Sequence, residues 1–458
     1  MDTYGRLYQH VLYPLWESVV RQRPTLARLR YLEKTQWRSL DELTAMQAGD
    51  LRRLLRHAYA NVPFYRRRFD AAGLKPDDVR GPDDLTKLPI VTRDEARGGI
   101  EERAATTGAT VDIKKATSGT LGTPLTFGYD MESEYWRQAI KLRGYGWAGY
   151  RPGLRSLHYW GAGAPNTSAL KRAKVNADHA IRRERYIDCG RRSPEDMARV
   201  VEAIAAYKPE VMLCYSQAGA DLARFVVAGN LRRWDSLPVI CGAERLLPAD
   251  RAVMNEAFGP DVFETYGSRE VMLMATECGE HDGLHIQMEN LIVEIVVRED
   301  SSGGVVPRLA KPGELGEVVV TDLHNFGMPF IRYATGDLAA PAPAGACKCG
   351  RAHPRLATVE GRVTETLLDA AGNRVNGLVF NVIIAHLAHA IRHFQVVQHR
   401  DRSITLRVVP TETFDAGIET ILRQTWEKYL AGVPVTIERV ADIPLSKSGK
   451  RQVVTVEK

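Results

Sequence analysis

The sequence lacks several features that would place it in a specialised class of protein. It has only six cysteines in 458 residues, so a disulfide framework is not expected and a reducing, cytoplasmic setting is. Its excess of basic over acidic residues is small, 62 against 56, and neither a basic tail nor a basic and aromatic repeat accompanies it. We therefore expect no nucleic-acid partner.

Long hydrophobic runs are also missing. The first 24 residues carry charged residues inside their apolar pattern, and the longest later run, residues 378–391, is interrupted by an asparagine and two histidines. Neither a signal peptide nor a membrane span is expected from such patterns. What is present is a globular composition, 44% hydrophobic, at a length that suggests two or three domains.

Helix and strand patterns divide the chain into four stretches. Residues 1–90 carry apolar residues three and four apart, which predicts a helical lead-in. Between residues 110 and 267 strands alternate with helices, which predicts right-handed βαβ units and a parallel sheet. After Gly283 the pattern predicts antiparallel strands. The residues from about 362 form a compact α+β unit, so the expected fold class is α/β with a smaller β subdomain and a separate C-terminal domain.

Individual elements can also be predicted. Asp130 and Ser193 are expected to cap helices, because acidic residues or a proline follow each of them. In the C-terminal unit the pattern predicts a hairpin around Gly372 and a helix over 380–393. The other predicted helices and strands are 110–116, 124–129, 211–216, 217–228, 237–242, 248–258, 262–267, 394–399, 403–410, 416–430 and 435–440.

The stretch 116–124, ATSGTLGTP, is chemically distinctive. Its glycines and hydroxyl residues can present backbone N–H and O–H donors to an anion without a side chain in the way, which suits the polyphosphate of ATP. The same composition is ordinary turn material. It is not a Walker A loop, because no Gly-Lys-Ser or Gly-Lys-Thr closes it.

Five motifs stand in order along the chain. They are TSGTLGTP at 117–124, CGAE at 241–244, YGSRE at 266–270, RYATGD at 332–337 and SKSGK at 446–450. In this order and at these spacings they resemble the adenylate-forming (AMP-binding) ligase superfamily, and within it the phenylacetate-CoA ligase and CapK-like branch. The resemblance implies an N-terminal AMP-binding domain of residues 1–361 and a C-terminal lid domain of residues 362–458.

The resemblance also implies roles for single residues. The loop would hold the β- and γ-phosphates of ATP, although the family's usual hydroxyl and lysine are replaced by Leu121 and Thr123. An aromatic face and a close backbone approach at YGSRE would receive adenine, and CGAE would line its other side. The carboxylate of Asp337 would take both ribose hydroxyls, and Arg362 would contact the ribose or the α-phosphate. In that order, these cofactor-binding residues are Ser118, Gly119, Thr120, Gly122, Tyr266, Gly267, Gly242, Ala243, Glu244, Asp337 and Arg362.

Two residues are implied to be catalytic. Glu270 resembles the acid that ligates Mg²⁺, a hard cation that prefers oxygen ligands. Lys450 resembles the lid lysine that stabilises charge as pyrophosphate leaves, with Lys447 as its nearby competitor. A hinge is expected at Val363–Glu365.

The implied activity is that of an acid–thiol ligase. ATP would convert a carboxylic acid, aromatic or small, to an acyl-adenylate, and CoA would then take the acyl group. Two alternatives stay open: transfer to an amine, as in polysaccharide or natural-product biosynthesis, and an inactive, zinc-stabilised binding scaffold. Tyr159, Trp160 and Tyr215 are candidates for the wall of the acid pocket, and core packing explains them equally well.

The cysteines suggest a second site. Cys347 and Cys349 form a CxC pair, and Cys278 precedes His285 by seven positions; thiolates and an imidazole suit tetrahedral Zn²⁺. His285 runs into a predicted strand and is preferred over His281, which lies in a loop. The remaining cysteines, Cys189, Cys214 and Cys241, are expected in the core.

Two further features have ordinary explanations. His386, His389 and His393 fall at helical spacing, for which an exposed helix face is a better interpretation than a metal site. The basic run 171–192 is expected to be a solvated surface, with binding of CoA phosphates or of another anionic acceptor as the alternative.

Overall fold

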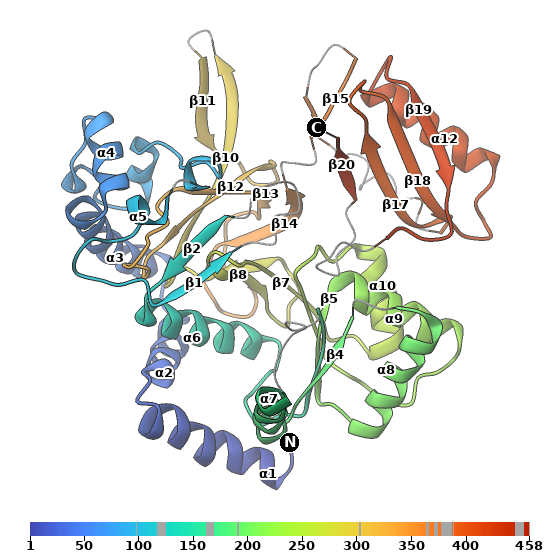
Figure 1. Cartoon of the computed structure of the whole chain (residues 1–458), viewed down its shortest axis with the longest axis horizontal. Helices are drawn as coiled ribbons and strands as arrows, with labels where there is room; N and C mark the ends of the chain where they lie inside the picture. The colour runs from blue at the N-terminus through green and yellow to red at the C-terminus, as the bar shows by residue number, and fades with distance from the viewer. Residues whose placement is uncertain are drawn as a thin grey trace.

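The structure is a computed structural model. It describes residues 1–97, 99–116, 125–161, 169–189, 192–301, 304–362, 366–370, 374–376, 387, 389–444 and 453–457. A 12-stranded sheet, in the order β11-β10-β12-β13-β14-β9-β8-β7-β6-β5-β3-β4, runs through its centre, and a separate four-stranded sheet lies in the C-terminal part (Figure 1). Among the described residues, no helix is long and apolar enough to traverse a bilayer.

One half of the large sheet is parallel. Its strands pair in the order β4-β3-β5-β6-β7, and α8, α9 and α10 connect them. This confirms the predicted βαβ units, but β3 and β4 were not predicted from the sequence. The bounds are β3 (Ser156–Trp160), β4 (Glu184–Asp188), α8 (Pro194–Tyr207), β5 (Val211–Tyr215), α9 (Ser216–Ala228), β6 (Val239–Gly242), α10 (Pro248–Phe258) and β7 (Val262–Ser268).

The other half of the large sheet is antiparallel, as the alternating pattern after Gly283 predicts. It continues from β7 through β8, which pairs antiparallel with it. The bounds are β8 (Met272–Glu277), β9 (Leu284–Ile286), β10 (Leu291–Ser301), β11 (Gly304–Leu309), β12 (Gly316–Asp322), β13 (Tyr333–Pro341) and β14 (Arg355–Arg362).

Outside the large sheet, the N-terminal part of the chain forms helices and the β1–β2 hairpin. A continuous helical run of residues 3–20 comprises α1 (Thr3–Leu7) and the wider turns η1 (Tyr8–Leu12) and η2 (Leu15–Val20). The predicted caps are in place, since Asp130 and Ser193 accept hydrogen bonds from the third residue beyond each of them. The further elements are α2 (Thr25–Thr35), α3 (Leu40–Asn61), η3 (Pro76–Asp78), α4 (Pro63–Ala71), η4 (Pro82–Lys87), η5 (Glu95–Arg97), α5 (Ile100–Arg103), β1 (Ile113–Ala116), β2 (Thr126–Tyr129), α6 (Met131–Trp147) and α7 (Ala169–Arg182).

The C-terminal unit has its own core. Its sheet has the order β19-β18-β17-β20, and its buried apolar cluster draws only on residues between Leu367 and Val454. This separation supports a domain boundary near residues 361–362, which stays a prediction. The elements are β15 (Thr366–Leu368), β16 (Arg374–Asn376), β17 (Ile391–Gln398), β18 (Ile404–Pro410), α12 (Ala416–Tyr429), β19 (Val435–Arg439) and β20 (Val454–Val456).

Two predictions in this unit were wrong in their bounds. The helix predicted over 380–393 cannot extend to His393, because Ile391, Arg392 and His393 belong to β17; residues 380–386 lie outside the described residues. The three histidines therefore do not share a helix face. The hairpin predicted over 357–375 is restricted to β15 and β16, because residues 355–362 join the large sheet as β14 and pair with β13.

Candidate active site and metal cluster

The predicted nucleotide-binding residues that the structure describes lie at one edge of the large sheet, the edge formed by the carboxyl ends of its parallel strands. Gly242 is the last residue of β6, Tyr266 and Gly267 stand near the end of β7, and Glu270 lies in the turn from β7 to β8. Ligands of open parallel sheets bind at the carboxyl ends of the strands. Asp337 reaches this edge from β13, in the antiparallel half of the sheet.

Tyr266 and Asp337 are directly connected. The Tyr266 hydroxyl donates a hydrogen bond of 2.9 Å to Oδ2 of Asp337, although the two residues are 71 positions apart. Burial, and then the negative charge of Asp337, raise the pKa of Tyr266 well above its ordinary value, so the phenol stays protonated as a donor. This bond holds one carboxylate oxygen of Asp337 in a defined direction beside the aromatic ring.

Glu270 is buried and held by two residues that the sequence did not single out. Only 3% of it is exposed. Nη1 of Arg93 lies 3.2 Å from Oε1, and the Tyr333 hydroxyl lies 3.4 Å from the same oxygen. Among the described residues, both of these contacts go to Oε1 of the carboxylate. Tyr333 sits inside the RYATGD motif, whereas nothing local in the sequence marked Arg93.

The backbone around these residues is constrained. A Cβ on Gly267 would lie 2.1 Å from the carbonyl oxygen of Met272, so only glycine permits the close approach of β7 and β8. Ala243 has a φ of 67°, a conformation that costs energy for a residue with a side chain and is typical of functional sites. The Glu244 carboxylate accepts a hydrogen bond from the Gln217 N–H at the start of α9, and its place beside adenine stays a prediction.

Other predicted residues fall in parts that the structure does not describe. These are the loop residues Ser118, Gly119, Thr120, Leu121, Gly122 and Thr123, the hinge residues 363–365, and both lysines, Lys447 and Lys450. The last described residue before the loop, Ala116, accepts a hydrogen bond of 2.9 Å from Arg269, the neighbour of Glu270. Ala116 therefore lies beside the YGSRE motif. Arg362 is described as a strand residue whose Cα pairs with that of Asp337.

Aromatic residues stand beside the same edge. The rings of Trp160 and Tyr215 meet at 4.6 Å in an edge-on arrangement, and a Cβ on Gly242 would lie 3.3 Å from the Trp160 ring. Tyr159, the preceding residue of β3, is fully buried in the core cluster of the parallel half. Successive strand residues face opposite sides of a sheet, so Tyr159 packs the core while Trp160 faces the candidate site.

The second predicted site is a compact cluster of sulfur and nitrogen ligands. One atom from each of Cys278, His285, Cys347 and Cys349 lies within 4.8 Å of the corresponding atoms of the others. The Sγ atoms of Cys278 and Cys347 are 3.8 Å apart, and Nε2 of His285 is 3.5 Å from Sγ of Cys349. The residues come from the end of β8, from β9 and from the loop before β14.

The histidine of this cluster is oriented by its other ring nitrogen. Nδ1 of His285 lies 3.3 Å from the His353 carbonyl oxygen, which favours the tautomer with Nε2 unprotonated toward the thiols. Burial lowers the pKa of His285 to about 4, so the ring is neutral at neutral pH. His281 is engaged elsewhere, since its Nδ1 lies 3.3 Å from a Glu277 carboxylate oxygen.

This donor set fits zinc. Three thiols and one imidazole match a Cys₃His site, the Cys278 and Cys347 side chains are buried, and the His285 ring is already oriented. Such a site would join the β8–β9 hairpin to the loop before β14. We propose that these four residues bind one structural Zn²⁺.

Comparisons with known proteins agree with this architecture. A family model described as the CapK C-terminal domain matches residues 367–457. The chain is 32% identical to a phenylacetate-coenzyme A ligase of Aromatoleum evansii, over 74% of each chain. It is 30% identical to that of Escherichia coli (strain K12), over 81% of this chain and 82% of that protein.

Solved structures show the same fold. A 2-hydroxyisobutyryl-CoA ligase in the postadenylation state superimposes with a TM-score of 0.70 at 19% identity, over 93% of this chain and 92% of that chain. The ATP-bound MatB of Rhodopseudomonas palustris superimposes with a TM-score of 0.50 at 17% identity, over 78% of this chain and 70% of that chain. At these identities the likeness is one of fold alone.

The zinc site can be tested by elemental analysis. We expect about one zinc per chain in protein produced with zinc available, and a clear loss of that zinc in Cys349→Ser, because one ligand of four is removed. His281→Ala is the matched control and should keep its zinc, since His281 pairs with Glu277 outside the cluster. Zinc-free wild-type protein, or equal zinc in Cys349→Ser and wild type, would contradict the assignment.

Proposed function

The chain belongs to the phenylacetate-CoA ligase family of adenylate-forming enzymes, and from this premise we propose that it activates a carboxylic acid with ATP and transfers the acyl group to CoA. One observation carries the proposal. Four residues lie at one edge of the sheet: Tyr266 and its partner Asp337, the buried Glu270, and Ala116, which directly precedes the loop 117–124. That edge is where an α/β sheet of this kind binds a nucleotide.

In the first half-reaction the carboxylate of the acid attacks the α-phosphorus of ATP, and pyrophosphate leaves. Asp337 suits the ribose, because a carboxylate can accept hydrogen bonds from both hydroxyls of a diol. Tyr266 keeps that carboxylate in place. Glu270 would bind a Mg²⁺ that accompanies ATP, while Arg93 and Tyr333 hold its Oε1. Positioning and charge neutralisation supply most of the rate in such transfers.

In the second half-reaction the thiol of CoA attacks the carbonyl of the acyl-adenylate and AMP leaves. The separate core of the C-terminal unit supports its movement as a lid between the two steps. Lys450, by resemblance, would approach the α-phosphate in the first step and withdraw in the second.

The acid should meet the ring pair of Trp160 and Tyr215. These rings adjoin Gly242 at the end of β6, next to the proposed nucleotide site. An aromatic pair provides a flat apolar wall, which suits an aryl or other small apolar group. The relatives that the chain matches are named for phenylacetate, which supports an aromatic acid.

The function is tested by ATP–pyrophosphate exchange over a panel of aryl and short aliphatic acids, followed by transfer from the accepted acid to CoA or to amines. We expect exchange with at least one acid and formation of its CoA thioester. If an amine but not CoA takes the acyl group from the acyl-adenylate, the protein is an amide synthetase and not an acid–CoA ligase. If no acid supports exchange and ATP does not bind, the chain is a scaffold.

Glu270→Gln tests the carboxylate at the centre of the site. Exchange should fall by roughly 10²-fold or more, because the neutral amide would be a poorer ligand than the carboxylate for a Mg²⁺ bound with ATP. Glu294→Gln is the matched control, since Glu294 is also buried and paired with an arginine, Arg332, but lies on β10. The two variants should first be shown by circular dichroism to have equal secondary structure. If both then lose exchange activity to a similar extent, Glu270 has only a structural role.

Lys450→Ala should lower ATP–pyrophosphate exchange by roughly 10²-fold or more while leaving CoA transfer from synthetic acyl-adenylate nearly unchanged, because the lysine would stabilise charge on the α-phosphate as pyrophosphate leaves. Lys447→Ala is the control and should keep most of the exchange. If Lys447→Ala loses exchange and Lys450→Ala does not, the catalytic lysine is Lys447. An unchanged exchange rate in both variants would show that neither lysine is catalytic.

A further inference from the structure

Exposed apolar side chains are concentrated in one part of the molecule. Among the described residues, 18 large hydrophobic side chains are exposed, and twelve of them lie in residues 1–20 and 170–186. Single exposed apolar residues are normal, but such a concentration marks an interaction surface. The twelve, which we call the basal face, are Met1, Tyr4, Leu7, Val11, Leu15, Trp16, Val19, Val20, Leu170, Val175, Ile181 and Tyr186.

The helical run of residues 3–20 carries a line of exposed apolar residues beside its buried contacts. Gly5 and Tyr8 are buried against the protein. Tyr4, Leu7, Val11, Leu15 and Val19 follow one another at intervals of three and four, which places them along one line of the helix, and they are 41–63% exposed. Such an apolar line along a helix is expected to be covered.

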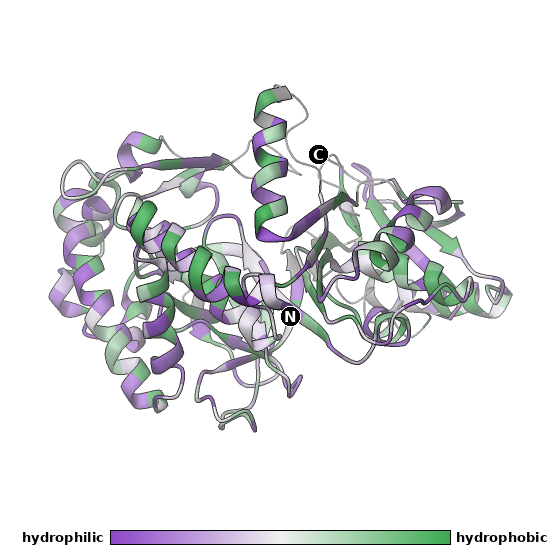
Figure 2. Cartoon of the chain, turned by 90° about the horizontal axis from the view of Figure 1, so that it is seen from below, coloured by the Kyte–Doolittle hydropathy of each residue, from purple (hydrophilic) through white to green (hydrophobic). Residues whose placement is uncertain are grey.

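α7 adds a second helix with an uncovered apolar face. Residues 170, 172–178 and 180–181 are all exposed, and Leu170 and Ile181 reach 82% and 55%. The Tyr4 hydroxyl donates a hydrogen bond of 3.0 Å to the Ile181 carbonyl oxygen, so the two helices meet. Seen from below, the run 3–20 extends diagonally from the N-terminus and α7 stands upright above it, and both carry hydrophobic residues interspersed with hydrophilic ones (Figure 2). Together they form one broad surface.

Positive charge gathers on α7 and the start of β4. Residues 170–186 contain six Lys and Arg against two Asp and Glu, whereas residues 1–20 contain one against two. The two segments together carry +3, half of the net charge of +6 on the whole chain. This surplus favours an anionic partner.

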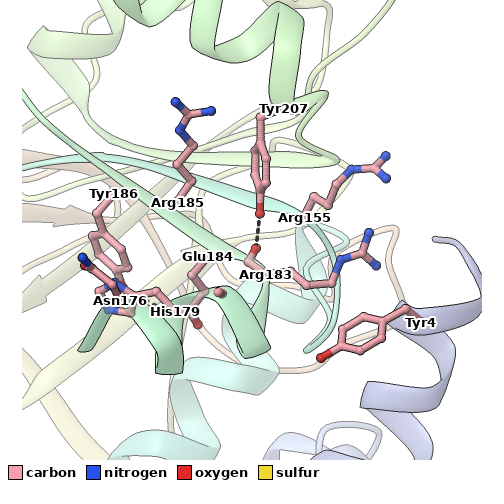
Figure 3. Close-up of a pocket in the computed structure, with 10 residues that line it drawn as sticks. Tyr4, Arg155, Asn176, His179, Arg183, Glu184, Arg185, Tyr186 and Tyr207 are labelled. Carbon is pink, nitrogen blue, oxygen red and sulfur yellow. Dashed lines mark hydrogen bonds between the residues drawn. The ribbon is translucent and has the colours of Figure 1, made fainter. Parts of the chain in front are cut away.

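Arginines and tyrosines also surround a hollow where the helices meet. It has a volume of about 680 Å³ and lies at the amino-terminal ends of β3 and β4 (Figure 3). Arg155, Arg183 and Arg185 line it together with Tyr4 and Tyr207. The Arg183 guanidinium donates two hydrogen bonds of 2.7 Å to the Asp2 carboxylate, an anionic group of the protein itself. Guanidinium groups bind phosphate oxygens in the same way.

The position and the charge of the basal face select its partner. A carrier protein that delivered a thiol would have to dock near the carboxyl ends of the strands, whereas the hollow lies at their amino ends. A second copy of the chain would bring two positive surfaces together. A lipid bilayer with anionic headgroups satisfies both properties, because it takes up apolar side chains and attracts arginine and lysine at once.

We propose that the basal face docks on an anionic membrane surface. The helical run 3–20 and α7 lie flat on the bilayer, with their exposed apolar residues between the headgroups. The surrounding arginines and lysines pair with lipid phosphates. The catalytic edge and the C-terminal unit, which Figure 1 shows on the far side from α1, stay open to the aqueous phase.

Vesicle co-sedimentation of the full chain tests this proposal. Binding should be at least ~10-fold stronger to phosphatidylcholine vesicles containing about 30% phosphatidylglycerol than to pure phosphatidylcholine, and should weaken as salt is raised. The apolar variant Leu7→Glu with Val11→Glu and the charge variant Arg172→Glu with Lys174→Glu should each lose ~10-fold or more of that binding. Circular dichroism and ATP–pyrophosphate exchange confirm that the variants are folded.

Matched changes elsewhere are the controls. Leu315→Glu with Ile421→Glu changes two residues that are each 43% exposed, and Arg52→Glu with Arg400→Glu changes two exposed arginines. Both controls should bind vesicles like the wild type. Equal loss in control and basal variants, or no preference for anionic lipid, would overturn the proposal. A second result would also overturn it. If the wild-type protein does not bind vesicles but sediments as a dimer, and Leu7→Glu with Val11→Glu dissociates that dimer, the basal face binds a second copy of the chain.

Discussion

The close pairing of β7 with its two neighbours is the constraint on which the rest of the molecule depends. β7 runs parallel to β6 on one side and antiparallel to β8 on the other, so it joins the two halves of the 12-stranded sheet. The approach of Gly267 to the Met272 carbonyl requires the absence of a side chain. That hairpin sets the position of Glu270 in its turn, and the bond from Tyr266 to Asp337 ties β7 to β13. A bulkier residue at 267 would displace all of these groups together.

The cysteine and histidine cluster lies in the antiparallel half of the same sheet. It connects the end of β8, the start of β9 and the loop before β14. Beyond it, His353 contacts Glu289, which also forms a buried ion pair with Arg143 of α6. Burial alone would raise the pKa of Glu289, but Arg143 and then His353 outweigh it and hold this pKa well below its usual range. The cluster is thus linked through charged, fully buried side chains to the helices that cover the sheet.

Sequence reasoning succeeded where the signal was local or periodic. The caps at Asp130 and Ser193, the helix 248–258 and the parallel strands 211–215 and 239–242 follow from patterns within about fifteen residues. It failed where tertiary contacts decide. β4 carries polar residues at a sheet edge and has no clear strand pattern, and the stretch from Ile391 to His393 fits a helix as well as a strand until β18 pairs with it. Arg93 could not be found at all, because its importance arises from a contact with Glu270, 177 positions away.

By itself the sequence determined which residue types are available for chemistry, their order along the chain, and through the five motifs the family whose fold they imply. These are properties of local spacing and residue identity, which need no coordinates. Only the tertiary structure decided that Tyr266 meets Asp337, that His285 and not His281 joins the thiols, and that Trp160 and not Tyr159 faces the site. Each of these depends on strand register and on which face of the sheet a side chain takes. Register is set by pairing between distant segments, and a shift of one residue would exchange the two faces.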